Sequence, residues 1–187
     1  MTLLLVSSVA DELGGLKGEV VGIGAISAAA RMAAILANQR PEKVLLIGTA
    51  SAYPGGPGLG EVVTARRVGT SASVAVMGLG YVPRPPSPLV CDPFILHNLN
   101  LESVDVLTAS AVTTDSVLAG RLSDGWQIEQ MEAFGVALAC AQADVPFAAI
   151  FGIASNAGPE AHVQWLSHRT EAQEAARLAV APMLISD

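Results

Sequence analysis

Charged and aromatic residues are scarce in this chain. Asp, Glu, Lys and Arg make up 14% of its 187 residues and aromatic residues 4%, whereas hydrophobic residues make up 51%. A surface with so few charges exposes a large apolar area, which indicates that part of it is covered by another protein surface. We therefore expect a homodimer or a larger homo-oligomer.

Long apolar runs are missing as well. Gly, Pro or a charged residue interrupts each apolar stretch before it reaches the roughly 20 residues that span a bilayer. The first ten residues are apolar, but they lack the basic residues of a signal peptide, and Asp11 and Glu12 follow at once. The sequence predicts neither a membrane protein nor a signal peptide.

Clusters of basic residues are absent, and cysteines are few. Ten Lys and Arg residues stand against 17 Asp and Glu residues, which gives a net charge of −7. Nucleic-acid binding requires concentrated positive charge, so we expect no nucleic-acid partner. Cys91 and Cys140 are too few for a disulfide framework, and a reducing cytoplasmic setting is expected.

What the chain does contain is an alternation of short apolar runs and helix-favouring stretches. We expect strands at residues 3–7, 20–23, 44–47, 61–65, 73–77, 104–110 and 147–153, and helices at 25–38, 115–122, 132–143 and 162–184. The length fits one domain, residues 1–187. This order predicts an α/β fold with a mixed, mostly parallel sheet flanked by helices on both faces.

One segment breaks the alternation. Residues 81–88, Tyr-Val-Pro-Arg-Pro-Pro-Ser-Pro, contain four prolines, which remove backbone donors and fix φ. The segment is predicted to be a rigid loop. Loops of this kind often take part in binding, although a plain surface connection is an equal alternative.

The segment from Gln130 to Ala137 places a single carboxylate, Glu132, at the start of an otherwise apolar helix. The helix leads into a buried strand that ends at Ser155 and Asn156. A carboxylate that enters a buried layer is costly unless a ligand or partner satisfies it. Glu132 is therefore a candidate ligand-binding residue.

Small residues follow two other predicted strands. Gly48-Thr49-Ala50-Ser51-Ala52 lies at the carboxyl end of one of them, where backbone amides can approach a ligand. Gly22-Ile23-Gly24 precedes an Ala-rich helix, but Ser27 stands where a dinucleotide fingerprint has its third glycine. We interpret the latter as a tight strand-to-helix turn.

These segments occur in a particular succession, continued by Gly60-Glu61-Val62-Val63, the proline-rich loop and Met131-Glu132. The succession resembles that of the purine nucleoside phosphorylase/nucleosidase superfamily, and within it the nucleosidases. The resemblance covers nearly the whole chain. It implies a nucleoside-phosphorylase-like fold and hydrolysis of the N-glycosidic bond of a purine nucleoside, without a metal or a cofactor.

The resemblance also assigns roles to residues. Glu12, after the first strand, matches the general base that activates water, with Asp11 as the alternative if the register shifts by one. Glu132 matches the glutamate that holds the ribose hydroxyls, and its charge would stabilise an oxocarbenium-like transition state. Thr49 and Ala50 would line the water and ribose side, and Val112 and Met131 would pack on the base or sugar.

The chain departs from the adenine-specific nucleosidases at Ser155-Asn156, where they carry Ser-Asp and the Asp protonates the leaving base. An amide cannot act as an acid, but Asn156 could donate to and accept from a 6-oxopurine. Because this chain has one extra residue before the pair, either Asn156 or Ser155 could take the acid's place. Phe151 replaces a family arginine, and Leu46 stands where phosphorylases bind phosphate through an arginine.

Gly158-Pro159-Glu160 resembles the helix start of futalosine hydrolases, which release hypoxanthine from futalosine on a menaquinone route. That activity is our first expectation for the chain. A methylthioadenosine/S-adenosylhomocysteine-type nucleosidase, a phosphorylase and a non-catalytic nucleoside-binding homologue remain alternatives. The last helix carries His162, Trp165, His168 and Arg169. The two histidines are interpreted as structural rather than as a metal site, because no acid or cysteine cluster accompanies them.

Overall fold

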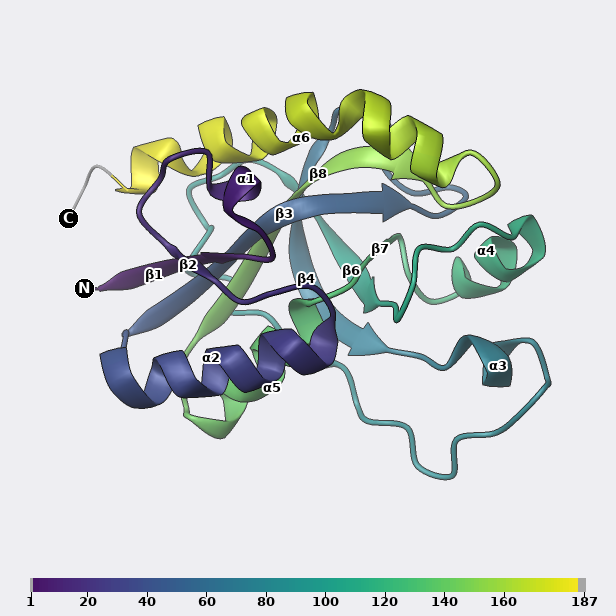
Figure 1. Ribbon diagram of the computed structural model, residues 1–187, viewed down its shortest axis with the longest axis horizontal. Coiled ribbons are helices and arrows are strands. Elements are labelled where there is room, and N and C mark those ends of the chain that lie inside the picture. Colours follow the sequence, from purple (N-terminus) through teal and green to yellow (C-terminus); the bar gives the residue numbers. More distant parts are fainter. Residues whose placement is uncertain (1, 185–187) are drawn as a thin grey trace.

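A mixed sheet forms the centre of the protein in the computed structural model, which describes residues 2–184 (Figure 1). Its strands are β1 Leu3–Ser7, β2 Glu19–Val20, β3 Lys43–Ala52, β4 Val62–Thr70, β5 Leu89–Val90, β6 Glu102–Thr108, β7 Ile128–Gln130 and β8 Phe147–Asn156. The helices are α1 Ala10–Leu13, α2 Ala25–Gln39, α3 Ser73–Val76, α4 Ser116–Leu122, α5 Ala133–Gln142 and α6 Ala161–Leu184. The expected mixed α/β fold is confirmed.

Five of the strands close on themselves. β3 pairs with β8, β8 with β4, β4 with β6, β6 with β7, and β7 again with β3. β1 and β2 extend the sheet beyond β3 in parallel, and β5 adds an antiparallel edge to β4. The closed circuit gathers the ends of β3, β6, β7 and β8 in one region.

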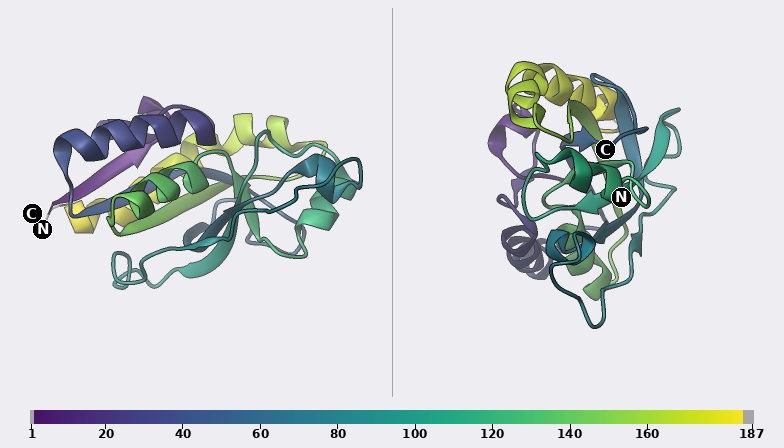
Figure 2. Two further views of the ribbon diagram at one scale, coloured as in Figure 1. Left: turned by 90° about the horizontal axis from the view of Figure 1, so that it is seen from below. Right: turned by 90° about the vertical axis from the view of Figure 1, so that its right-hand side faces the viewer.

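Alternation along β3 separates the two larger clusters of the core. Val44 and Leu46 belong to the cluster that includes residues of α2 and α5, whereas Leu45 and Ile47 belong to the cluster that includes residues of α6. Figures 1 and 2 show α6 across the sheet from α2 and α5. Because successive strand residues point to opposite faces, one apolar strand supplies both clusters.

Two predicted strands differ from the structure. Where a strand was predicted at residues 73–77, the structure has the short helix α3, Ser73–Val76, followed by Met77 as its C-cap and by Gly78 with φ 75°. The alternating small and β-branched residues fit a strand, but β5 occupies the edge of β4 that such a strand would need. The strand predicted at 20–23 is only two residues long, because its Gly22 and Gly24 have positive φ and end the pairing.

The proline-rich segment, residues 81–88, contains no regular secondary structure and is exposed along its length. It connects α3 to β5 and projects away from the sheet in Figure 1. The prediction that it is an irregular loop is confirmed.

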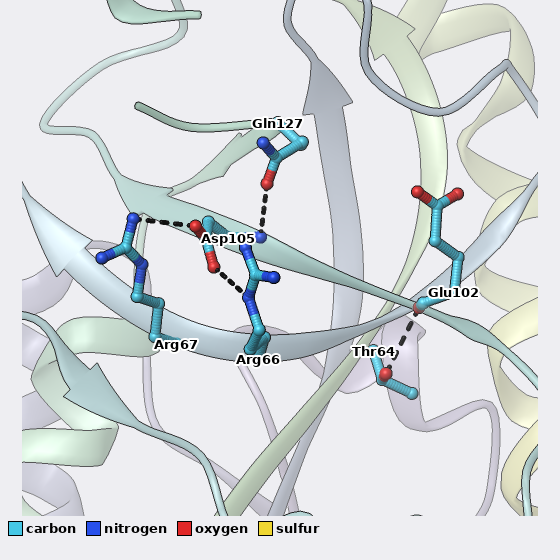
Figure 3. Close-up of polar contacts among 6 residues, drawn as sticks. All are labelled: Thr64, Arg66, Arg67, Glu102, Asp105 and Gln127. Carbon is cyan, nitrogen blue, oxygen red and sulfur yellow. Dashed lines mark hydrogen bonds and ion pairs between the residues drawn. The ribbon is translucent and has the colours of Figure 1, made fainter. Parts of the chain in front are cut away.

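A bulge in β4 directs two arginines toward a buried carboxylate of β6. The pairing register shifts between Ala65 and Arg67, so Arg66 is an extra residue and both arginines reach the buried Asp105, each at 2.8 Å (Figure 3). Burial alone would raise the pKa of Asp105, but the hydrogen bonds from Arg66 and Arg67 lower it below its ordinary value. The Asp105 backbone N–H also donates to Gln127 Oε1 at 2.7 Å. These contacts fix the closed part of the sheet.

Candidate active site

A cavity of about 450 Å³ lies where the ends of β3, β6, β7 and β8 meet α1 and α6. This volume is within the range of small-molecule sites. All but one of the residues predicted for the site line it: Glu12, Thr49, Ala50, Val112, Met131, Glu132 and Ser155. Residues far apart in the sequence thus line one cavity, and Asn156 is the exception.

Glu12 is buried and held by backbone and side-chain donors. Its Oε2 accepts from the backbone N–H and the Oγ of Ser8 at 3.0 and 2.6 Å, and its Oε1 accepts from Thr49 N–H at 3.2 Å. A Cβ at Gly48 would lie 3.1 Å from Oε1, so the glycine allows this close approach. Burial raises the pKa of Glu12, and these hydrogen bonds oppose the rise. Asp11 also lines the cavity but is exposed.

Glu132 lies at the N-cap of α5. Its Oε1 accepts from the Gly24 N–H at 2.8 Å. Gly24 has φ 86°, and the tight strand-to-helix turn predicted from the sequence presents an amide to this carboxylate. Burial raises the pKa of Glu132 to about 7; the Gly24 bond opposes the rise and the nearby charge of Glu12 adds to it. Two carboxylates that repel each other therefore share the cavity.

Gln130 orients Glu132 and was not identified from the sequence. Its Oε1 accepts from the Glu132 backbone N–H at 2.6 Å, and its Nε2 donates to Thr108 Oγ1 at 3.0 Å. Thr108 Oγ1 also accepts from the Phe134 N–H at 2.8 Å, in the first turn of α5. Its position directly before Met131-Glu132 was the available signal.

Glu129 is a third buried carboxylate of the cavity and was also missed. It accepts hydrogen bonds from Tyr53 Oη at 2.6 Å, Thr113 N–H at 2.7 Å and Thr113 Oγ1 at 2.6 Å. The Thr113 carbonyl in turn accepts from Gly158 N–H at 2.8 Å. Glu129 thus holds together the segments that follow β3 and β6, and the Thr113 carbonyl links them to the segment that follows β8. Its position, three residues before Glu132, was visible in the sequence, but its partners were not.

Ser155 and Asn156 point in different directions. Ser155 is fully buried in the cavity wall, with its Oγ 2.6 Å from Ser51 Oγ. Asn156 is exposed outside the cavity, where its backbone N–H donates to Gln164 Oε1 at 2.8 Å. The β3–β8 register shifts by one residue just before Ser155, which leaves Ala154 as the extra residue. The bulge determines that Ser155 faces inward.

One face of α6 forms a further wall. His162, Trp165, Arg169 and Gln173 all line the cavity, and their spacing of three and four residues puts them on one helical face. His162 was interpreted from the sequence as structural, and Trp165 and Arg169 were assigned no role, because no local signal tells which face of a long helix meets a cavity. His168 instead contacts the Gln164 carbonyl at 2.8 Å.

Neither a metal site nor a membrane span emerges from residues 2–184. Within that range, no three His, Cys, Asp or Glu side chains are grouped so that they could bind a metal ion, and no helix has the length and hydropathy to cross a bilayer.

No family model matches the chain, but individual proteins do. It is 33% identical over 171 residues to a futalosine hydrolase of Thermus thermophilus. This alignment covers 81% of the present chain and 76% of the Thermus protein. It is 27% identical over 165 residues to a 5′-methylthioadenosine/S-adenosylhomocysteine nucleosidase of a Geobacillus species. That alignment covers 77% of the present chain and 69% of the Geobacillus protein.

Solved structures share the fold over nearly the full length. A futalosine hydrolase mutant of Helicobacter pylori superposes with a TM-score of 0.85 at 14% identity, covering 99% of both chains. A 5′-methylthioadenosine/S-adenosylhomocysteine nucleosidase of Neisseria meningitidis, bound to methylthio-immucillin-A, gives 0.83 at 19% identity, covering 100% of this chain and 99% of that one. The chain therefore belongs to the purine nucleoside phosphorylase/nucleosidase superfamily and is a nucleosidase, a hydrolase of N-glycosidic bonds.

Proposed function

We propose that the protein hydrolyses the N-glycosidic bond of a hypoxanthine nucleoside, with futalosine as the first candidate. The observation that carries the proposal is the pair of buried carboxylates, Glu12 and Glu132, in a cavity of nucleoside size. The identity to the Thermus futalosine hydrolase supports this choice of substrate.

Glu12 acts as the general base for water. Burial holds its pKa above the ordinary value, which brings a carboxylate closer to the basicity that proton abstraction near neutral pH requires. Ser8 and Thr49 fix its oxygens, so the carboxylate is oriented before the substrate arrives. Water, rather than phosphate, is the nucleophile, because Leu46 is buried in the core and provides no cation.

Glu132 holds the two ribose hydroxyls. A carboxylate accepts hydrogen bonds from a vicinal diol well, and such charge-assisted bonds are strong. When the bond to the base breaks, the sugar gains positive charge, and ionised Glu132 stabilises that state more than the ground state. With a pKa of about 7 in the free protein, Glu132 is ionised in a growing fraction of molecules as the pH rises through neutrality.

The part of the cavity that would hold the purine base favours a 6-oxopurine. Ser155 occupies the inward position at the end of β8, and a hydroxyl can hydrogen-bond to a purine edge but is a poor acid. Both oxygens of Glu129 already accept bonds from Tyr53 and Thr113, so it is engaged as an acceptor. Without a strong acid, a base that leaves readily as an anion, as a 6-oxopurine does, is preferred. This replaces the role predicted for Asn156.

The proposal extends to the oligomeric state of the protein, its cellular compartment and the arrangement of its sheet. Leu79, just before the proline-rich loop, and Tyr81, its first residue, are 82% and 84% exposed, and we infer that a second copy of the chain covers them. Both cysteines are buried and free, which fits a cytoplasmic enzyme. Among residues 2–184 the sheet has five parallel and three antiparallel pairings, and we regard it as a mostly parallel sheet with helices on both faces.

The test is release of free base in phosphate-free buffer. The protein is incubated with futalosine, inosine, 5′-methylthioadenosine and S-adenosylhomocysteine, and base and sugar are separated by chromatography. We expect hypoxanthine and a free sugar, with kcat/KM at least about tenfold higher for a hypoxanthine nucleoside than for its adenine counterpart, a difference of about 1.4 kcal/mol.

Other outcomes identify the alternatives. A sugar 1-phosphate formed only with added phosphate would show a phosphorylase. Preferred cleavage of the adenine compounds would show a methylthioadenosine/S-adenosylhomocysteine-type nucleosidase. Binding without base release would show a non-catalytic homologue.

A further inference from the structure

We propose that Glu129 accepts a hydrogen bond from the N1–H group of a 6-oxopurine base and thereby selects hypoxanthine over adenine nucleosides. The inference rests on the proposed function and names the residue that determines its base specificity. It starts from a buried carboxylate of the cavity that neither activation of water nor binding of the ribose uses.

Three polar residues form a row across neighbouring strands. Glu129 of β7 is paired with Ser51 of β3, and Ser51 is paired with Ser155 of β8. Residues opposite each other on paired strands point to the same face of a sheet, and all three are buried and line the cavity. The ends of the row are two strand spacings of about 4.8 Å apart, which leaves room for a purine edge with a hydrogen bond at each end.

Glu129 has one acceptor position left. Within residues 2–184, its Oε2 accepts from Tyr53 Oη and Thr113 Oγ1, both at 2.6 Å, whereas its Oε1 accepts only from the Thr113 N–H, at 2.7 Å. A carboxylate has about four acceptor positions, two on each oxygen. A donor of the ligand can therefore occupy the remaining position on Oε1.

The partners of Glu129 keep it in the role of an acceptor. Burial and the charge of Glu129 raise the pKa of Tyr53, so the phenol remains a donor. The Thr113 N–H can only donate. The remaining position on Oε1 is therefore suited to an N–H group of the ligand and not to another acceptor.

The two serines supply a donor at the other end of the row. Ser51 Oγ and Ser155 Oγ lie 2.6 Å apart, so one of their two hydroxyl hydrogens lies between the oxygens and the other is left for the ligand. From β8 to β7, the row thus presents first a donor and then an acceptor.

This order matches a 6-oxopurine. Along the edge of hypoxanthine, N7 and O6 are acceptors and N1–H is a donor, so the serines face N7 or O6 and Glu129 faces N1–H. In adenine the exocyclic amine is a donor and N1 is an acceptor. Adenine would place its N1 lone pair against the Glu129 carboxylate and leave buried groups unpaired, which weakens its binding.

The experiment removes the N1–H group from the substrate and the acceptor from the protein. The substrates are inosine and 1-methylinosine, which share the sugar and O6, and the ratio of their kcat/KM values is measured in phosphate-free buffer. The proteins are wild type, Glu129→Met, Glu129→Gln and Tyr53→Phe. Tyr53→Phe is the matched control, because it removes a bond to Oε2 and none to Oε1. Calorimetry compares binding of the free bases hypoxanthine and 1-methylhypoxanthine.

We expect wild type and Tyr53→Phe to favour inosine about ten- to hundredfold, the range of one charge-assisted hydrogen bond. In Glu129→Met the ratio falls to about one, because no acceptor is left. In Glu129→Gln it falls to about three- to tenfold, because the Thr113 N–H holds the amide oxygen at the Oε1 position and a neutral acceptor is about half as strong. Glu129→Gln keeps a partner for each neighbour, so it decides the case if Glu129→Met does not fold.

Contrary results have definite meanings. A ratio near one in wild type, or an unchanged ratio in Glu129→Met or Glu129→Gln, overturns the inference, because the methyl group would then be tolerated or be excluded by shape alone. A loss in Tyr53→Phe as large as in Glu129→Met also overturns it, since the network would then act only as a support. Base release from neither inosine nor futalosine contradicts the proposed function instead, while a calorimetric preference for hypoxanthine that is lost in Glu129→Met still supports recognition of N1–H by Glu129.

Discussion

Replacing Glu132 with Gln separates the two consequences of burying a carboxylate in this cavity. The substitution keeps the size of the side chain and removes its charge. Gly24 N–H can still donate to the amide oxygen at the position where it now donates to Oε1, 2.8 Å away. The change should therefore stabilise the free protein and impair catalysis at the same time.

The effect on stability follows from the pKa. A rise from 4.5 to about 7 means that ionised Glu132 costs the folded state about 3 kcal/mol at pH well above 7. Because the folded-state pKa lies above the unfolded one, the stability contributed by Glu132 is fully present below pH 4.5 and is lost as the pH rises through about 7. The neutral amide avoids this loss.

Burial of the amide offsets part of the gain, so we expect the variant to be more stable by about 1–3 kcal/mol at about pH 8.5. For a chain of this length that corresponds to a melting temperature roughly 3–10 °C higher. The difference should disappear as the pH falls toward 4.5, the ordinary value for this carboxyl.

The effect on activity has the opposite sign. Losing one preorganised charge opposite the developing cation should cost about 2–4 kcal/mol of transition-state stabilisation, or roughly a 30- to 1,000-fold lower kcat/KM. Thermal unfolding between pH 4.5 and 8.5 and kinetics on a hypoxanthine nucleoside measure both effects. Glu174→Gln, on an exposed part of α6 outside the cavity, is the control and should change neither.

The reasoning is refuted if Glu132→Gln keeps most of its kcat/KM, since Glu132 would then be only a helix cap. It is also refuted if the variant is no more stable than wild type at high pH, because burial would then carry no electrostatic cost.

Two further predictions concern packing and assembly. Gly135→Ala should destabilise the fold by about 1–3 kcal/mol in urea unfolding, because a Cβ there would collide with the Ala25 carbonyl and separate α5 from α2. Gly120→Ala, in α4 with open space around it, is the control and should be neutral or slightly stabilising; equal effects would show that the α2–α5 contact is not close. Tyr81→Asp should shift the protein toward monomer in sedimentation at micromolar concentration, and a wild type that is already monomeric would contradict the inferred interface.

Much of the site could be predicted because its signals are local. Glu132 stands out as an acid at the start of an apolar helix, and the small residues around Thr49 follow a buried strand, whereas Glu12 was assigned through the family resemblance. Such positions show where strand ends and helix starts lie. The structure brings them into one cavity, as the ends of paired strands require.

The partners of these residues could not be predicted. Glu132 meets Gly24 across 108 residues of sequence, and Tyr53 reaches Glu129 across 76. The face of α6 that carries Trp165 and Arg169 is defined only by what the helix packs against. Contacts of this kind depend on how strands pair, and pairing leaves little trace in a local pattern.

Ser155 and Asn156 show the limit of what the sequence predicts about the site. The order of apolar and polar residues predicts that a polar pair ends the last strand, and the family resemblance places this end near the two carboxylates. Which member of the pair faces the cavity depends on strand pairing. Side chains alternate along a strand, so one extra residue reverses their directions, and that residue, Ala154, is set by the register of β8 against β3.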